Sequence, residues 1–258
     1  RWAKNLCFKI AVSGKGGNGK TSIASLIIRY LKKNKLGPIL AVDADANANL
    51  GESLGLSFEE TIGSIIASFN DEKIKIPSGL TKGAYLEFRL NETIVESEGL
   101  DLIAMGRGAG TGCYCYPNTV LKNFIDSLVA NYTYMVMDNE AGMEHLSRRT
   151  TEDIDELLLI SDHSVKGIRT VARIRDLVSE LKLVVKRQSI IINRVPKVID
   201  PRITRELSEL GLKPIATIPL DEELRQYDLE QKPLLELPDT SKAVQEIGKL
   251  MTKVLNQK

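Results

Sequence analysis

The 258-residue sequence predicts a single α/β domain, in which a mostly parallel sheet carries helices on both faces. Short apolar segments typical of buried strands alternate with segments whose apolar residues recur every three or four positions, which is typical of helices. The hydrophobic content of 43% suits one sizeable core, and no linker rich in Pro, Gly or Ser interrupts the chain. We therefore expect residues 1–258 to form one domain.

Six apolar segments are predicted strands: residues 7–13, 39–43, 100–105, 134–138, 157–161 and 190–193. The segments with a helical period are residues 20–33, 118–130, 167–181, 202–210 and 241–255. Residues 85–90 alternate between apolar and polar side chains instead, which predicts a half-exposed strand in an edge hairpin. Ligands of such sheets bind beyond the carboxyl ends of the strands, so functional residues are expected there.

The overall composition restricts the class of partner. Lys and Arg number 35 while Asp and Glu number 34, so the formal charge of +1 gives no reason to expect nucleic acid or an anionic membrane. No uninterrupted apolar run exceeds four residues, and Lys9 interrupts any signal-peptide core. A membrane span needs roughly 20 apolar residues. Three cysteines are too few for a disulfide framework, so we expect a cytoplasmic protein with reduced thiols and no membrane span.

The strongest motif is a phosphate-binding loop that directly follows the first predicted strand and opens a helix. It fits G-x-x-x-x-G-K-T and consists of Gly14, Lys15, Gly16, Gly17, Asn18, Gly19, Lys20 and Thr21. Backbone N–H groups and the helix N-terminus would bind phosphate, Lys20 would reach the β- and γ-phosphates, and Thr21 would bind magnesium. Ser22 completes the predicted nucleotide-binding set. A chance glycine turn is the alternative, but it does not explain the strand, the helix and Lys20 together.

Carboxylates end two further predicted strands. Asp43 and Asp45 follow the second strand and should lie beside the phosphate loop, although an Asx-rich loop that caps a helix is an alternative explanation. Asp138 ends residues 134–138, and apolar residues followed by a terminal acid match a Walker B element that holds magnesium through water. We therefore predict that Thr21 and Asp138 hold magnesium.

Lys15 lies inside the loop and resembles the signature lysine of the deviant Walker A, MinD-like ATPases. The resemblance implies a homodimer in which Lys15 reaches the nucleotide of the other subunit and acts on hydrolysis together with Lys20. It also implies that Asp43 supports the magnesium shell and that Asp45 orients or deprotonates the attacking water. A solvated loop cation is the alternative for Lys15. Asn18, and Ala46 in place of a frequent proline, depart from the pattern.

The same resemblance makes residues 139–149 switch II, in which Gly142 gives the backbone freedom to respond to the γ-phosphate. The histidines His145 and His163 fit hydrogen-bonded structural roles better than catalytic or ligand roles.

The base of the nucleotide is predicted from the strand that ends at Asn193. Guanine-specific P-loop proteins usually carry N-K-x-D there, and this chain lacks that aspartate, so ATP is favoured. In MinD-like ATPases the corresponding Asn contacts adenine, and a segment resembling residues 218–221 packs against the base. The resemblance therefore adds Asn193, Arg194, Pro219 and Asp221 to the nucleotide site. Asn193 could equally be a strand-ending turn residue.

Cys113 and Cys115 lie in a glycine-rich loop and offer a soft half-site for nickel, zinc or copper(I). Because few other ligands lie nearby, a second copy of both thiols across a two-fold axis is the simplest completion. Inert packed cysteines, a redox pair and oxidation-prone bystanders are the alternatives. Cys7, within the first strand, is predicted to be a small core residue.

Four strings together resemble the CooC/AcsF group of nickel-insertion ATPases, over residues 10–221: G-K-G-G-x-G-K-T, D-x-D-x-x-A-N-L, G-C-x-C and D-x-E-A-G-x-E-H-x-x-R. The resemblance implies an ATP- and Mg²⁺-dependent homodimer that binds Ni²⁺ through Cys113 and Cys115. Its client would be carbon monoxide dehydrogenase or acetyl-CoA synthase. Two alternatives remain: an iron–sulfur electron carrier, and a positioning ATPase whose amphipathic residues 241–258 lie on a membrane instead of covering the sheet.

Overall fold

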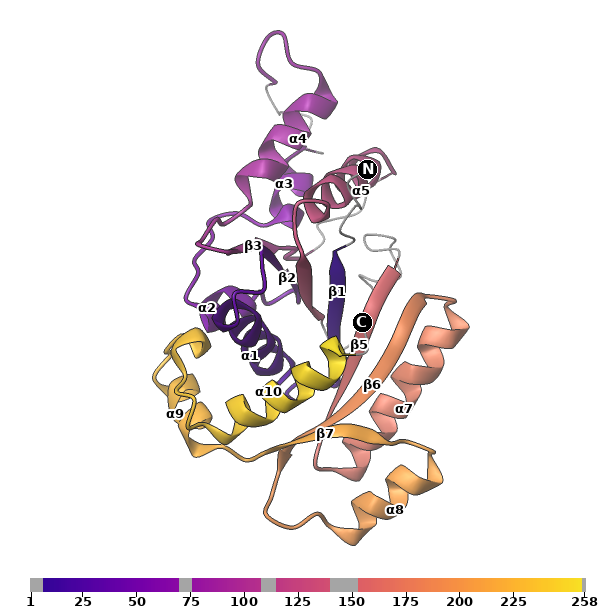
Figure 1. The fold of residues 1–258 in the computed structure, drawn as a ribbon. Helices are drawn as coiled ribbons and strands as arrows, with labels where there is room; N and C mark the ends of the chain where they lie inside the picture. Colours follow the sequence, from indigo (N-terminus) through magenta and orange to yellow (C-terminus); the bar gives the residue numbers. More distant parts are fainter. Residues whose placement is uncertain (1–6, 70–75, 108–114, 140–152, 257–258) are drawn as a thin grey trace.

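The computed structural model describes residues 7–69, 76–107, 115–139 and 153–256, without the side chains of residues 115–118. Seven parallel strands form one sheet in the order β3-β2-β4-β1-β5-β6-β7. Figure 1 shows the sheet between layers of helices. The strands are β1 (Phe8–Gly14), β2 (Ile39–Ala44), β3 (Leu100–Ala104), β4 (Tyr134–Asn139), β5 (Asp153–Asp162), β6 (Val184–Val195) and β7 (Pro214–Pro219). The predicted α/β class and the parallel sheet are confirmed.

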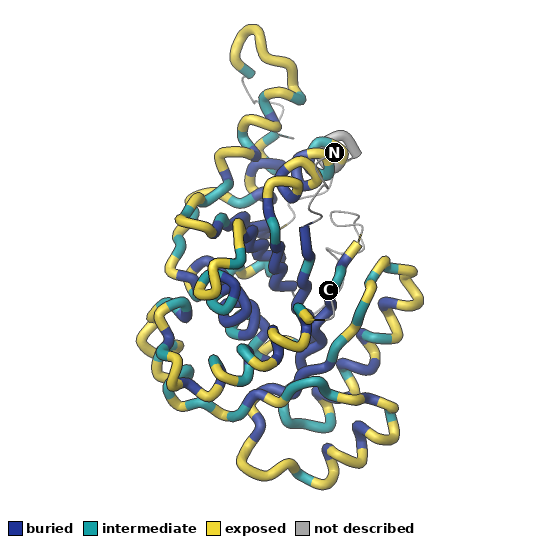
Figure 2. The backbone as a smooth tube through the Cα atoms, in the orientation of Figure 1, coloured by how far each residue is buried: buried dark blue, intermediate teal, exposed yellow. Residues whose placement is uncertain are grey.

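Helices bury apolar side chains on both faces of the sheet, and Figure 2 shows the strands as the buried centre. One core contains residues of α1 (Lys20–Lys33), α2 (Leu50–Leu54) and α10 (Lys242–Leu255). The other contains residues of α3 (Ile62–Phe69), α4 (Lys82–Glu92), α5 (Cys115–Val129), α7 (Val165–Glu180) and α8 (Pro201–Glu209). Strand β1 contributes Ile10 and Val12 to the first core and Ala11 to the second, because successive side chains of a strand point to opposite faces.

The prediction of an edge strand at residues 85–90 is wrong, because this segment lies inside helix α4. Thr81 caps the helix by accepting a hydrogen bond from the N–H of Ala84 at 3.2 Å. Leu86 and Leu90 are fully buried, whereas Phe88 between them is 56% exposed. Apolar residues at positions i, i+2 and i+4 fit either period, and the buried pair at i and i+4 selects the helix.

Four elements lie in segments that had no predicted secondary structure: α2, α3, β7 and α9 (Glu222–Leu229). The same is true of the 3-10 turn at Leu234–Glu236. Strand β7 begins and ends with proline, which is tolerated there because the strand lies at the sheet edge.

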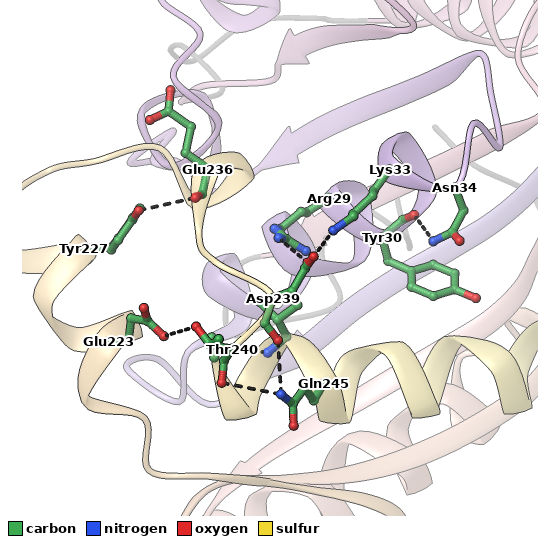
Figure 3. A network of polar contacts seen from close by, with 12 residues as sticks. Arg29, Tyr30, Lys33, Asn34, Glu223, Tyr227, Glu236, Asp239, Thr240 and Gln245 are labelled. Atoms are coloured by element: carbon green, nitrogen blue, oxygen red, sulfur yellow. Dashed lines mark hydrogen bonds and ion pairs between the residues drawn. The ribbon is translucent and has the colours of Figure 1, made fainter.

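The predicted helix near the end of the chain covers the sheet. Its apolar stripe, which includes Ile247, Leu250 and Val254, is buried in the core that it shares with α1. Figure 3 shows Asp239 in ion pairs with Arg29 at 2.8 Å and with Lys33, which attaches the turn before α10 to helix α1. Within the described residues, no helix is both long enough and apolar enough to cross a membrane.

Candidate nucleotide site

The phosphate loop lies at the carboxyl end of the central strand β1, where helix α1 begins. At Gly14, a Cβ atom would lie 2.2 Å from the carbonyl oxygen of Ile160 in β5. At Gly19, the backbone has φ 83° and a Cβ atom would lie 2.4 Å from Nδ2 of Asn193. Larger residues at these two positions would clash with fixed neighbours, so the loop can pass between the strand ends only with glycine there.

Positive charge gathers where the loop enters the helix. Lys20 is the first residue of α1 and is 7% exposed. The first turn of α1 contains no acidic residue, so its free N–H groups and the helix dipole add to the charge of Lys20. Lys15 and Ser22 are partly exposed on the same segment. This arrangement suits a phosphate group.

Asp43 and Asp138 face each other across the β2–β4 pair, in direct register. Asp43 is fully buried, and its carboxylate accepts hydrogen bonds from the N–H groups of Leu50 at 2.7 Å and Asp45 at 3.1 Å. Burial raises the pKa of Asp43 to about 7 and the pKa of Asp138 to about 6, in spite of the opposing charge of Lys20 near Asp138. Two buried carboxyls at one edge are a costly arrangement unless a cation joins them.

The residues around Asp138 fit Mg²⁺. Oδ2 of Asp138 accepts a hydrogen bond from the hydroxyl of Thr21 at 2.6 Å. Oδ1 is buried and has no hydrogen-bond partner in the described part of the chain. Mg²⁺ prefers oxygen ligands and binds few protein carboxylates directly, so Thr21 and Asp138 are the residues that would hold it. Both oxygens of Asp43 already bind backbone N–H groups, and its support of the magnesium shell stays a prediction.

Asp45, the predicted hydrolytic residue, follows the buried end of β2 and is partly exposed. Its Oδ1 accepts a hydrogen bond from the N–H of Asn47 at 2.8 Å, which forms an Asx turn. Helix α2 begins after Asn49, whose side chain makes no capping hydrogen bond. The buried carboxylate of Asp43 caps the helix instead, by accepting from its first N–H. Asp45 is therefore not needed as the cap and lies at the surface of the site.

Asn193 and Arg194, at the end of β6, hold the phosphate loop from the side. Nδ2 of Asn193 donates to the carbonyl oxygen of Asn18 at 2.9 Å, and Nη1 of Arg194 donates to that of Gly17 at 2.9 Å. The side chain of Asn18 is buried and donates to the carbonyl oxygen of Ile160 at 3.3 Å. These hydrogen bonds position the loop backbone, a role that the sequence analysis did not identify. Contact of Asn193 with adenine stays a prediction.

Asp221, which is predicted to lie near the base, accepts hydrogen bonds from the starts of two helices. Its Oδ1 caps α9 by accepting from the N–H groups of Glu223 and Leu224, and its Oδ2 accepts from Ser241 at 2.7 Å and Ala243 at 2.8 Å. Pro219 ends β7. Asp221 therefore joins the starts of α9 and α10, and the nucleotide contacts of Pro219 and Asp221 stay predictions.

The remaining candidates fall into two groups. Cys113, Gly142 and His145 lie outside the described residues, as does the side chain of Cys115. Cys7 lies in the core, as predicted, and Nε2 of His163 accepts a hydrogen bond from the N–H of Asp200 at 3.2 Å, in a structural role. The described part of the chain holds no cluster of three or more His, Cys, Asp or Glu residues that could bind a metal.

The sequence analysis placed Asn139 at the start of switch II but did not identify its hydrogen bond to β1. It is buried directly after Asp138, and its Nδ2 donates to the carbonyl oxygen of Val12 at 3.1 Å. This bond fixes the end of β1 just before the phosphate loop. The position after a strand-ending acid is the only sequence signal for it.

The sheet, the glycine loop and the Lys20–Thr21–Asp138 arrangement define a P-loop nucleotide-binding protein. The chain belongs to the CobQ/CobB/MinD/ParA nucleotide binding domain family, which it matches over residues 9–234.

The curated relatives differ in how much of the chain they cover. It is 41% identical to an uncharacterized ATP-binding protein of Methanocaldococcus jannaschii, covering 96% of this chain and 99% of the relative. It is 29% identical to the carbon monoxide dehydrogenase accessory protein CooC of Rhodospirillum rubrum, covering 67% of this chain and 70% of that protein. The solved ParA family ATPase from Chlorobium tepidum has the same fold, with a TM-score of 0.72, 21% identity and coverage of 98% and 100%.

Proposed function

We propose that this chain is a Mg²⁺-dependent ATPase that works as a homodimer and supports nickel insertion into carbon monoxide dehydrogenase or acetyl-CoA synthase. The observation that carries the proposal is the combination of the phosphate site with Cys113 and Cys115 in one chain. The similarity to the accessory protein CooC supports the same function. Strand β3, after which the chain continues to the cysteines, ends beside the site, since the N–H of Met105 donates to the carbonyl oxygen of Asp43 at 2.7 Å.

The hydrolytic roles follow from charge and position. Lys20 neutralises negative charge on the β- and γ-phosphates, and Lys15 of the second copy adds positive charge where the transition state develops it. Asp45, at the surface of the site, orients the attacking water and accepts its proton. Asn193 and Arg194 hold the loop so that its N–H groups are already aligned. Mg²⁺ held by Thr21 and Asp138 would supply charge neutralisation on the phosphate oxygens.

The metal cargo would bind between two copies. Each chain contributes Cys113 and Cys115, and four thiolates are a full ligand set for Ni²⁺ or, as the alternative, Zn²⁺. A site shared by two chains loses half of its ligands when they separate, so the nucleotide state and the metal affinity are linked. Under this proposal the protein works in the cytoplasm, where its client enzyme acquires nickel.

A nickel titration of the full chain under reducing, anaerobic conditions tests the cargo site. We expect one Ni²⁺ per two chains in the wild type, and loss of that site in Cys113→Ser and in Cys115→Ser. The matched control is Cys7→Ala, which removes the third thiol from the core and should keep the nickel stoichiometry. Sedimentation with and without a non-hydrolysable ATP analogue, for the wild type and Lys15→Ala, tests the dimer. Equal nickel stoichiometry in all variants, or a monomer under every condition, contradicts the proposal.

A further inference from the structure

A groove of about 780 Å³ lies at the β3 edge of the sheet, away from the phosphate loop. Its walls are the segment before α3 and one side of α4. We call it the β3-edge groove and define it by Phe58, Glu59, Glu60, Tyr85, Phe88 and Glu92. Val95 already covers the free edge of β3 with two backbone hydrogen bonds to Leu102, each 2.9 Å long. A ligand of this groove would therefore bind to side chains and not by adding a strand.

Aromatic side chains form the apolar part of the groove. Phe88 is 56% exposed, on the side of α4 opposite the buried residues Leu86 and Leu90. Phe58 and Tyr85 are partly buried in the walls. An exposed Phe contributes nothing to the core, and three aromatic rings around one hollow are typical of a surface that receives another molecule.

The charged part of the groove is acidic. Arg89 lies among the lining residues, where Nη2 binds both oxygens of Glu60 at 2.9 and 2.7 Å and Nε pairs with Glu92 at 2.8 Å. The hydrogen bonds with Glu60 and, to a smaller extent, Tyr85 raise the pKa of Arg89. Its positive charge is neutralised by the two carboxylates that it pairs with. Glu59 is exposed and has no ion-pair partner within the described ranges. Three carboxylates against one guanidinium leave the lining negative.

We propose that the β3-edge groove docks a partner protein through a segment in which arginine or lysine flanks an apolar residue. The apolar residue would pack on Phe88, and the cationic groups would bind Glu59 and the outer faces of Glu60 and Glu92. A guanidinium over the Tyr85 or Phe88 ring adds a cation–π interaction. Charge complementarity sets this choice, because an acidic or uncharged apolar segment would desolvate Glu59 without pairing it and would leave the excess negative charge of the lining uncompensated.

This inference goes beyond the proposed function and requires neither nickel nor nucleotide. One wall of the groove, the segment before α3, is nevertheless held at both ends by hydrogen bonds near the nucleotide site. Leu50, which begins α2, is bound by Asp43, and the N–H of Gly63, in the first turn of α3, donates to the carbonyl oxygen of Met105 at 2.8 Å. A partner docked here would contact the segment whose end is hydrogen-bonded to Met105, after which the chain continues to the cysteines.

The test uses the full chain labelled with 4-fluorophenylalanine and titrated with the peptide acetyl-Arg-Leu-Arg-Leu-amide, without metal or nucleotide. Fluorine resonances of Phe58 and Phe88 are assigned with Phe58→Leu and Phe88→Leu. We expect both resonances to shift on titration. The peptide with citrulline in place of arginine should bind with an affinity lower by about fivefold or more. Glu59→Lys and Phe88→Ala should each weaken binding by about fivefold or more.

The matched controls are Glu222→Gln and Leu229→Ala, because both residues are exposed on α9 and lie outside the groove. They should bind the peptide as the wild type does. Unshifted resonances, equal binding of the citrulline peptide, or wild-type binding by Glu59→Lys and Phe88→Ala would overturn the proposal. Loss of self-association in Phe88→Ala without any peptide response would overturn it as well and would assign the groove to a second copy. Since the titration contains no nickel, its result is independent of the cargo site.

Discussion

The nucleotide site and the β3-edge groove are built in opposite ways. In the nucleotide site the important side chains, among them Asp43, Asp138 and Asn193, are buried at the strand ends. Each is hydrogen-bonded to the loop or helix start that faces it, through a backbone group for Asp43 and Asn193 and through the hydroxyl of a threonine for Asp138. In the groove the important side chains, such as Phe88 and Glu59, are exposed and come from two segments on the surface. Substitutions in the first site therefore change folding and chemistry together, whereas those in the second should change binding alone.

The buried polar groups of the nucleotide site cost free energy on folding. Each carboxylate or amide there has lost its water, so it either binds a neighbour or leaves an unpaired atom. Oδ1 of Asp138 and Oδ1 of Asn139 are such unpaired atoms in the described part of the chain. The groove has no comparable cost, because its acidic side chains keep much of their water. This difference predicts a graded series of effects.

The largest effect is expected at Lys20. Its charge is held at the start of α1 beside Asp138, where no other described side chain replaces it. Lys20→Ala should lower kcat/KM for ATP hydrolysis by about 100-fold or more, measured by phosphate release. Lys82→Ala, at the exposed start of α4, is the matched control and should hydrolyse ATP normally. Normal hydrolysis by Lys20→Ala in a folded protein would show that the loop does not bind phosphate as proposed.

The next effect concerns pH in the absence of Mg²⁺. The folded pKa of Asp138 is about 6 against an ordinary 3.8, so the folded protein holds a proton that the unfolded chain has released. The contribution of Asp138 to the free energy of unfolding is therefore fully present below pH 4 and is lost as the pH rises to about 6. The loss is on the order of 3 kcal/mol in the free energy of unfolding. Urea denaturation in EDTA should show this fall in the wild type.

Asp138→Asn should show a smaller fall in the free energy of unfolding, because it removes this titrating group and leaves the contribution of Asp43, which has the same sign. Saturating Mg²⁺ should also reduce the pH dependence of the free energy of unfolding of the wild type. If the free energy of unfolding falls equally for the wild type and the variant between pH 4 and 6, Asp138 is not desolvated as the fold indicates.

Much of the fold could be predicted from the sequence, because periodicity reports burial directly. Six strands and five helices follow from it, with ends that differ by a few residues. Strand β7 was missed because proline at both ends and Thr217 in the middle hide its apolar character. Helix α4 was misassigned because Leu86, Phe88 and Leu90 fit both periods, and only the position of the core decides between them.

The candidate site was predictable to the extent that it is local in the chain. The glycine loop, Thr21 and Asp138 are motif residues, and the parallel sheet brings them to one edge. The bond from Asn193 to the loop depends on the strand order, which places β5 between β1 and β6 and lets Asn18 reach Ile160. The groove depends on the packing of α4 against the segment before α3, and no motif encodes it.

Asn193 offers a direct test of that unpredicted bond. Asn193→Ala leaves the carbonyl oxygen of Asn18 without its donor in a buried position, which should lower the free energy of unfolding by about 1–2 kcal/mol. KM for ATP should rise as well, because the loop backbone is less well aligned. Arg194→Ala removes a more exposed bond to Gly17 and should cost less. Equal stability of the wild type and Asn193→Ala in urea denaturation would remove Asn193 from the positioning role.

The smallest effect is expected at Phe88, where the contrast between the two sites is sharpest. Its ring is mostly exposed, so Phe88→Ala should change the free energy of unfolding by less than about 0.5 kcal/mol. It should also leave ATP hydrolysis unchanged. Leu86→Ala, two residues earlier in the same helix but fully buried, should lower the free energy of unfolding by about 2–5 kcal/mol in the same urea denaturation. If Phe88→Ala destabilises the protein as much as Leu86→Ala does, the ring belongs to the core, and the groove is not an open surface for a partner.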